Sequence, residues 1–212
     1  MTNLLQSEKF LKNLENSNLG SCILYSGYNI RYETTNLPEF DILDEQSTII
    51  LKKGEGGVTY QNKSSDSINI LDYEDFIQNL KNKKKGIKSC DFLVYSTKKN
   101  FFICNELSIG KHSNKWPKAR YQFIDTLKYL YKSNDIKTFI NSFANKMCLL
   151  SLRDEIPDTP EENMLEGFFE PYKLQKKPEK LEYKPIDDKY NFSIWEANLI
   201  AYNTDESISI LN

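Results

Sequence analysis

Apolar positions along the chain switch between helical and strand-like spacing, and this pattern predicts a mixed α/β fold. Residues 3–16 carry leucine and phenylalanine at helical spacing and predict a short amphipathic helix. Stretches rich in Ile, Tyr and Thr at 22–33 and 47–53 then predict strands, and further short strands are expected at 58–60 and 68–71.

The middle of the chain carries the clearest signals. A cap residue, early acids and helical apolar spacing predict a helix over 72–82. The run "SCDFLVYSTKKNFFICNELSIGK" at 89–111 reads as two strands joined by the turn "STKKN". A long helix over 115–133 follows, then a short helix at 136–145 and an apolar run at 146–153 that predicts an interior strand.

The character of the chain changes towards its end. Residues 154–170 are strongly acidic, and four of the seven prolines lie between 157 and 178, so we expect a loop-rich excursion there. The stretches 192–202 and 207–211 read as strands that could form a terminal hairpin.

Length and composition favour one globular domain over residues 1–212, because 39% hydrophobic and 13% aromatic content can form a real core. With 28 basic and 30 acidic residues, the net charge is −2, so nucleic-acid binding would need a local basic patch. No signal peptide or long apolar stretch is evident, and we expect a cytoplasmic protein that does not enter membranes.

Several kinds of site are disfavoured. Cys22, Cys90, Cys104 and Cys148 form no CxxC pair, and reduced core thiols are the simplest interpretation. His112 is the only histidine, which disfavours zinc sites and histidine-dependent nucleophilic catalysis. Neither a P-loop nor a GxGxxG motif is present, which disfavours dinucleotide-dependent and nucleotide-hydrolysing chemistry.

Two acids stand inside the predicted strand pair. If "STKKN" closes a hairpin with Tyr95 opposite Phe102, then Asp91 lies directly opposite Glu106 on the same face of the sheet. Like charges at such positions are destabilising, and a bound divalent cation with oxygen ligands would offset their repulsion. The alternative is that Asp91 caps the strand entrance while Glu106 pairs with a lysine or turns to solvent.

The segment "CDFLVYSTKKNFFICNELS", with a helix before and after it, resembles the core of the restriction-endonuclease-like superfamily, the PD-(D/E)XK nucleases. The resemblance covers residues 72–152 and implies a central mixed sheet flanked by helices, with Asp91 and Glu106 as ligands to Mg²⁺ or Mn²⁺. Residues 1–71 would then be an N-terminal extension, and 153–212 would hold the acidic excursion and extra terminal strands.

The chain departs from the family pattern at one position. Where the family has Lys two residues after the Glu, this sequence has Ser108, which cannot supply positive charge. We expect Lys118 to replace that lysine, with Gln122 one helical turn away as a polar neighbour and Lys111 as the second candidate. The alternatives are that Lys118 is a solvated helix-face charge and that the catalytic step has been lost.

The resemblance also implies a third carboxylate from the preceding helix, for which Glu74 is the first candidate and Glu55 the weaker one. Glu74 in a first helical turn would equally complement the helix dipole.

Basic segments at 81–88 and 111–120 flank the acid pair in sequence and could form a groove that follows a phosphate backbone. Their alternative role is that of a solvated loop and a helix start. The candidate nucleic-acid contacts are Lys83, Lys84, Lys85, Lys115, Arg120 and Gln122.

Two functions from different classes remain open. The first is a divalent-metal-dependent nuclease that hydrolyses DNA or RNA, for which a setting in prokaryotic defence is an analogy. The second is a catalytically inactive nuclease-fold module that binds nucleic acid or a partner protein, the latter through 154–170. A small α+β binding protein without nuclease ancestry is a third, weaker reading.

Overall fold

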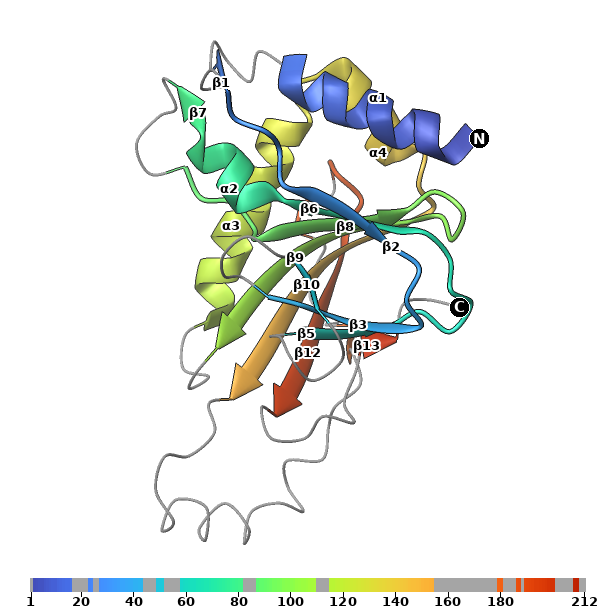
Figure 1. Cartoon of the computed structure of the whole chain (residues 1–212). Helices are drawn as coiled ribbons and strands as arrows, with labels where there is room; N and C mark the ends of the chain where they lie inside the picture. The colour runs from blue at the N-terminus through green and yellow to red at the C-terminus, as the bar shows by residue number, and fades with distance from the viewer. Residues whose placement is uncertain are drawn as a thin grey trace, which may run out of the picture.

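The computed structural model of the chain has a seven-stranded sheet that lies between a layer of helices and a smaller sheet (Figure 1). The residues that the structure describes are 2–16, 23–24, 27–43, 49–51, 58–81, 87–109, 115–154, 179–180, 186–187, 189–200 and 208–209.

The large sheet is mixed. Its strand order is β11-β12-β10-β9-β8-β6-β2, with antiparallel pairing from β9 to β2 and parallel pairing of β10 with both β9 and β12. The connection from β9 to β10 contains two helices, as a parallel crossover requires. The strands are β2 (Tyr32–Thr35), β6 (Ile68–Asp72), β8 (Phe92–Ser96), β9 (Phe101–Ile109), β10 (Asn145–Asp154), β11 (Glu179–Lys180) and β12 (Ser193–Ile200).

Helices cover one face of this sheet. They are α1 (Thr2–Asn16), α2 (Tyr73–Gln78), α3 (Lys115–Leu130) and α4 (Asn134–Asn141). Phe10 of α1 joins α4 to the sheet, because its ring stacks on Phe139 at 4.5 Å and meets the edge of Tyr95 at 5.5 Å. The strand residues that face the helices alternate along β8 and β9 and are Leu93, Tyr95, Phe102 and Cys104.

A four-stranded sheet, ordered β13-β5-β3-β4, covers the other face. It consists of β3 (Glu39–Ile42), β4 (Ile50–Leu51), β5 (Val58–Gln61) and β13 (Ile208–Ser209). Phe40 and Tyr60 stack at 5.5 Å and pack with Phe92 and Val94 of β8. Since both faces of the central strands are covered, all five residues of β6 and of β8 are buried.

Several expectations are confirmed. The fold is mixed α/β with a central mixed sheet flanked by helices, and the predicted helices at 3–16, 115–133 and 136–145 correspond to α1, α3 and α4. The run 146–153 lies within the interior strand β10. Cys90, Cys104 and Cys148 are free, buried thiols.

The short strands β1 (Ile23–Leu24) and β7 (Leu80–Lys81) form a small antiparallel pair. The predictions for the two stretches that contain these strands were wrong. The stretch 22–33 is not one strand, because it turns at Gly27, whose φ of +85° suits glycine. The helix predicted over 72–82 ends at Gln78. Leu80 and Lys81 form β7 and pair with β1 instead of continuing the helix.

The predicted terminal hairpin is also wrong. β12 lies parallel to β10 in the large sheet, whereas β13 lies parallel to β5 in the small one. Of the predicted strand 47–53, the structure has Ile50–Leu51, and its residues 47–48 and 52–53 lie outside the described residues. The acidic segment 155–178 lies outside them as well.

Candidate functional site

The hairpin formed by β8 and β9 has the predicted register. Tyr95 is opposite Phe102, and the pairing continues to Phe92 opposite Asn105. One more step along both strands brings Asp91, the residue before β8, opposite Glu106 of β9. Directly opposite side chains have Cβ atoms about 4.5–5.5 Å apart. The two acids are therefore neighbours on the helix-covered face of the sheet.

The position of Asp91 is held at its side chain and at its backbone. Its carboxylate Oδ2 accepts a hydrogen bond from the backbone N–H of Leu107 at 2.6 Å. Its carbonyl oxygen accepts from the N–H groups of Tyr73 at 2.8 Å and Glu74 at 3.2 Å, the first residues of α2. The start of α2 and the strand β9 thus hold Asp91 from two directions.

Helix α3 holds the residues that precede Asp91. Gln122 Nε2 donates to the carbonyl oxygen of Ser89 at 3.0 Å, and the backbone N–H of Cys90 donates to Thr126 Oγ1 at 2.9 Å. Gln122 is only 7% exposed, and its Oε1 accepts no hydrogen bond from the described residues. Gln122 therefore fixes the chain beside the acids and does not present its amide on an open surface.

Both acids are nearly buried, at 4% exposure each. Removing two neighbouring carboxylates from water is costly unless a proton, a cation or hydrogen-bond donors compensate the charge. Oxygen donors of this kind suit a hard divalent cation such as Mg²⁺. A cation, a proton or donors such as the Leu107 N–H, which already bonds to Asp91, would each compensate this charge.

Glu74 is close to Asp91 through its backbone, but its side chain serves its own helix. The carboxylate Oε1 of Glu74 accepts from Gln78 Nε2 at 3.0 Å on the exposed side of α2. Within the described ranges, no group of three or more His, Cys, Asp or Glu side chains is placed to hold a metal ion. The role of Glu74 as a third ligand stays a prediction.

Some of the candidate basic residues lie on α3, and the others fall outside the described residues. On α3, Lys118 is exposed, and Lys115 and Arg120 are half-buried. Ser108 lies two residues beyond Glu106 on the same face, opposite Leu152 of β10. The remaining candidates lie outside the described residues, and they are Lys83, Lys84, Lys85, Lys111 and Glu55.

A second polar group supports α2, and of its members only the cap residue was predicted from the sequence. Asp72 caps the helix by accepting from the Asp75 N–H at 2.9 Å, and it pairs with Arg31 at 2.6 Å. Burial raises the pKa of the Asp72 carboxyl despite the opposing effects of the Asp75 hydrogen bond and Arg31. Tyr28 donates to Asp75 Oδ2 at 2.7 Å. The cap could be recognised in the sequence, but neither Arg31 nor Tyr28 is near it along the chain.

Three thiols lie beside the acid pair. Cys104 is opposite both Leu93 of β8 and Cys148 of β10, and Cys90 precedes Asp91. Burial raises the pKa of all three thiols, and for Cys90 the negative charge of Glu106 adds a smaller increase. These cysteines therefore stay protonated at neutral pH and act as small apolar side chains.

Comparison of the chain with known protein families, with curated proteins and with solved structures gives no match. Among the described residues, none of the helices combines the length and apolar character that spanning a membrane demands.

Proposed function

We propose that this protein is a divalent-metal-dependent nuclease that hydrolyses phosphodiester bonds of DNA or RNA. In this proposal β8, β9, α3 and β10 form a restriction-endonuclease-like core, and Asp91 and Glu106 bind Mg²⁺ or Mn²⁺. Helix α2, Asp91 directly before β8, Glu106 within β9 and helix α3 follow one another along the chain, and this order supports the proposal.

The proposal depends on the β8–β9 register, which ends with Phe92 opposite Asn105 and, extended by one residue, places Asp91 opposite Glu106. The hydrogen bond from Leu107 N–H directs the Asp91 carboxylate towards the strand that carries Glu106. Two carboxylates together with water and phosphate oxygens form a common ligand set for Mg²⁺.

Each residue then has a distinct role. Asp91 and Glu106 supply the protein ligands, and α3 keeps Asp91 in place through Gln122 and Thr126. A bound divalent ion would orient the phosphodiester and lower the pKa of the attacking water. Lys118 or Lys111 would offset negative charge on the phosphate, and the lysines at 83–85, with Lys115 and Arg120, would contact the nucleic-acid backbone.

Two observations favour the alternative, a catalytically inactive module of the same fold that binds nucleic acid or a protein. Ser108 stands where the family has its lysine. Both acids are 4% exposed, which leaves little surface for a substrate to contact directly. In this alternative the acid pair is a structural feature of the core.

Cleavage assays separate the two functions. Wild type, Asp91→Asn and Glu106→Gln are incubated with single- and double-stranded DNA and RNA in Mg²⁺ or Mn²⁺. Glu15→Gln, which changes an exposed acid on α1, is the matched control. A nuclease would lose at least about 100-fold in rate in both site variants and keep full activity in the control. Equal rates in all four proteins would contradict the proposal.

A further inference from the structure

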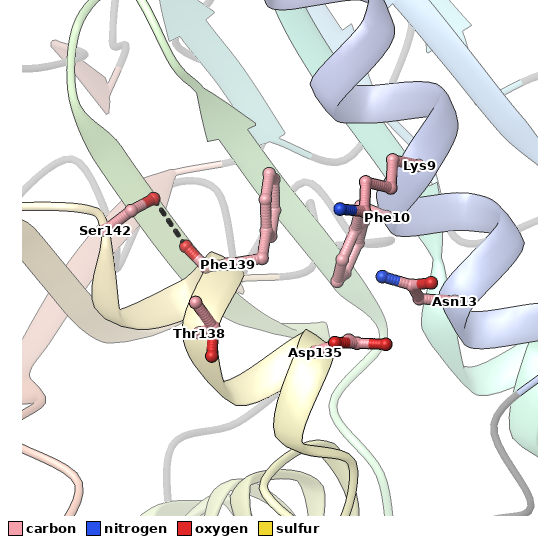
Figure 2. Close-up of a pocket in the computed structure, with 7 residues that line it drawn as sticks. All are labelled: Lys9, Phe10, Asn13, Asp135, Thr138, Phe139 and Ser142. Carbon is pink, nitrogen blue, oxygen red and sulfur yellow. Dashed lines mark hydrogen bonds between the residues drawn. The ribbon is translucent and has the colours of Figure 1, made fainter.

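Helices α1 and α4 form the walls of a groove with a volume of about 240 Å³ (Figure 2). It lies above the turn end of the β8–β9 hairpin, because Phe10 at its base contacts Tyr95 and Phe102. Those residues are four positions along the strands from Asp91 and Glu106, or roughly 13 Å at about 3.3 Å per residue. The groove is lined by Lys9, Phe10 and Asn13 of α1 and by Asp135, Thr138, Phe139 and Ser142 at α4.

The floor of the groove is apolar and consists of packed aromatic rings. Phe10 and Phe139 stack with an interplanar angle of 20°, and Phe10 is only 1% exposed. Phe139 also meets Tyr95 and Phe143 edge to face. A ligand could therefore place apolar atoms against the exposed part of the Phe139 ring, which Phe10, Tyr95 and Phe143 pack around.

The rim of the groove carries polar groups that the protein does not use internally. The side chains of Lys9, Asn13 and Asp135 make no hydrogen bond or ion pair with any described residue, and Figure 2 shows them around the Phe10 ring. The two hydroxyl groups differ, since Thr138 donates to Asn134 O at 2.8 Å and Ser142 donates to Phe139 O at 2.6 Å. Lys9 and Asn13, one helical turn apart, offer donors, and Asp135 offers a negative charge.

We infer that this groove binds a free α-amino acid with an apolar side chain. The ligand carboxylate would lie on Lys9 and Asn13, its ammonium on Asp135, and its side chain on the half-buried ring of Phe139, which Phe10 backs. A simple anion or cation would satisfy only one of the two opposite charges, whereas a zwitterion satisfies both. The volume of about 240 Å³ is below the roughly 300–1,000 Å³ of pockets for drug-sized ligands, which suits a ligand as small as an amino acid. This inference is independent of the proposed nuclease activity.

The test is a titration of the ¹⁵N-labelled full chain with L-leucine, followed by amide chemical shifts. We expect saturable shifts at Lys9, Asn13, Asp135 and Phe139, with a Kd in the millimolar range because the rim is exposed. Lys9→Gln and Asp135→Asn should each weaken binding by at least about tenfold, since each removes a charge-assisted contact. Lys12→Gln changes an exposed lysine of α1 outside the groove and should bind as wild type does.

Two derivatives distinguish a free amino acid from a peptide end. N-acetyl-leucine lacks the ammonium and resembles a C-terminus, whereas leucinamide lacks the carboxylate and resembles an N-terminus. Weaker binding of both supports the inference. Binding of either as tightly as leucine, unchanged affinity in both charge variants, or no saturable shift by about 10 mM leucine would overturn it.

Discussion

The carboxylate of Asp91 accepts a 2.6 Å hydrogen bond from the backbone N–H of Leu107, the residue that follows Glu106. This hydrogen bond joins the residue before β8 to β9. It brings the carboxylate of Asp91 to the backbone of the residue next to Glu106. The acid pair is therefore held by the strand that carries its second member.

Replacing Asp91 tests this contact. Asp91→Leu should lower the free energy of unfolding by about 1.5–3 kcal/mol, because the buried N–H of Leu107 loses a charged acceptor. Asp91→Asn keeps an acceptor oxygen and should cost less. Urea unfolding of both variants measures the difference, and equal stabilities would mean that the hydrogen bond contributes little.

Thr126→Val tests how α3 holds the chain before Asp91. The substitution keeps the shape of the side chain but removes the acceptor for the buried Cys90 N–H. We expect a loss of about 1–3 kcal/mol in the free energy of unfolding. Thr138→Val, on the exposed side of α4, is the control and should change stability much less. Similar losses in both variants would argue against a special role for Thr126.

The ion pair of Asp66 with Lys98 joins the turn before β6 to the turn of the β8–β9 hairpin. The hydrogen bond from Lys98, with a further one from Ser64, lowers the pKa of the Asp66 carboxyl. A lowered pKa in the folded state adds stability above the unfolded value of about 3.9, and this stability is lost as the pH falls through the folded pKa.

Asp66→Asn should therefore lower the melting temperature at pH 7 and have a smaller effect at pH 3. Lys98→Gln should reproduce this dependence, because it removes the same pair. Thermal unfolding at the two pH values measures the effect. A destabilisation by Asp66→Asn that is independent of pH would assign it to the lost geometry and not to the charge.

The buried thiols predict low reactivity. In a Cys22→Ser background, which removes the one cysteine outside the described residues, a thiol reagent should label essentially no cysteine of the native protein. Burial raises the pKa of Cys90, Cys104 and Cys148, so the reactive thiolate is scarce. Three thiols should react after denaturation, and fast labelling of the native protein would contradict their burial.

The strand pair could be predicted from sequence because its signals are local. The alternation of apolar residues on both sides of a short turn was sufficient to pair Tyr95 with Phe102, and the opposition of Asp91 and Glu106 follows by counting. The same local reasoning correctly gave a cap at Asp72.

Other features depend on contacts between distant segments. Leu80 continues the apolar spacing of α2, yet it pairs with Leu24, a residue 56 positions earlier. Gln122 shares a helix face with Lys118 by spacing, but only the packing of α3 against Ser89 shows that its amide is buried. Local spacing does not contain this information.

The most direct test of the account is a magnesium titration of the melting temperature. If Asp91 and Glu106 bind Mg²⁺, saturating metal at about 100 times its Kd should add about 2.7 kcal/mol to the free energy of unfolding. This corresponds to a rise of about 5–10 °C for a chain of this size. Asp91→Asn and Glu106→Gln should lose the rise, and Glu15→Gln should keep it. An unchanged melting temperature in wild type, or an equal rise in all four proteins, would contradict the assignment of the metal to this pair.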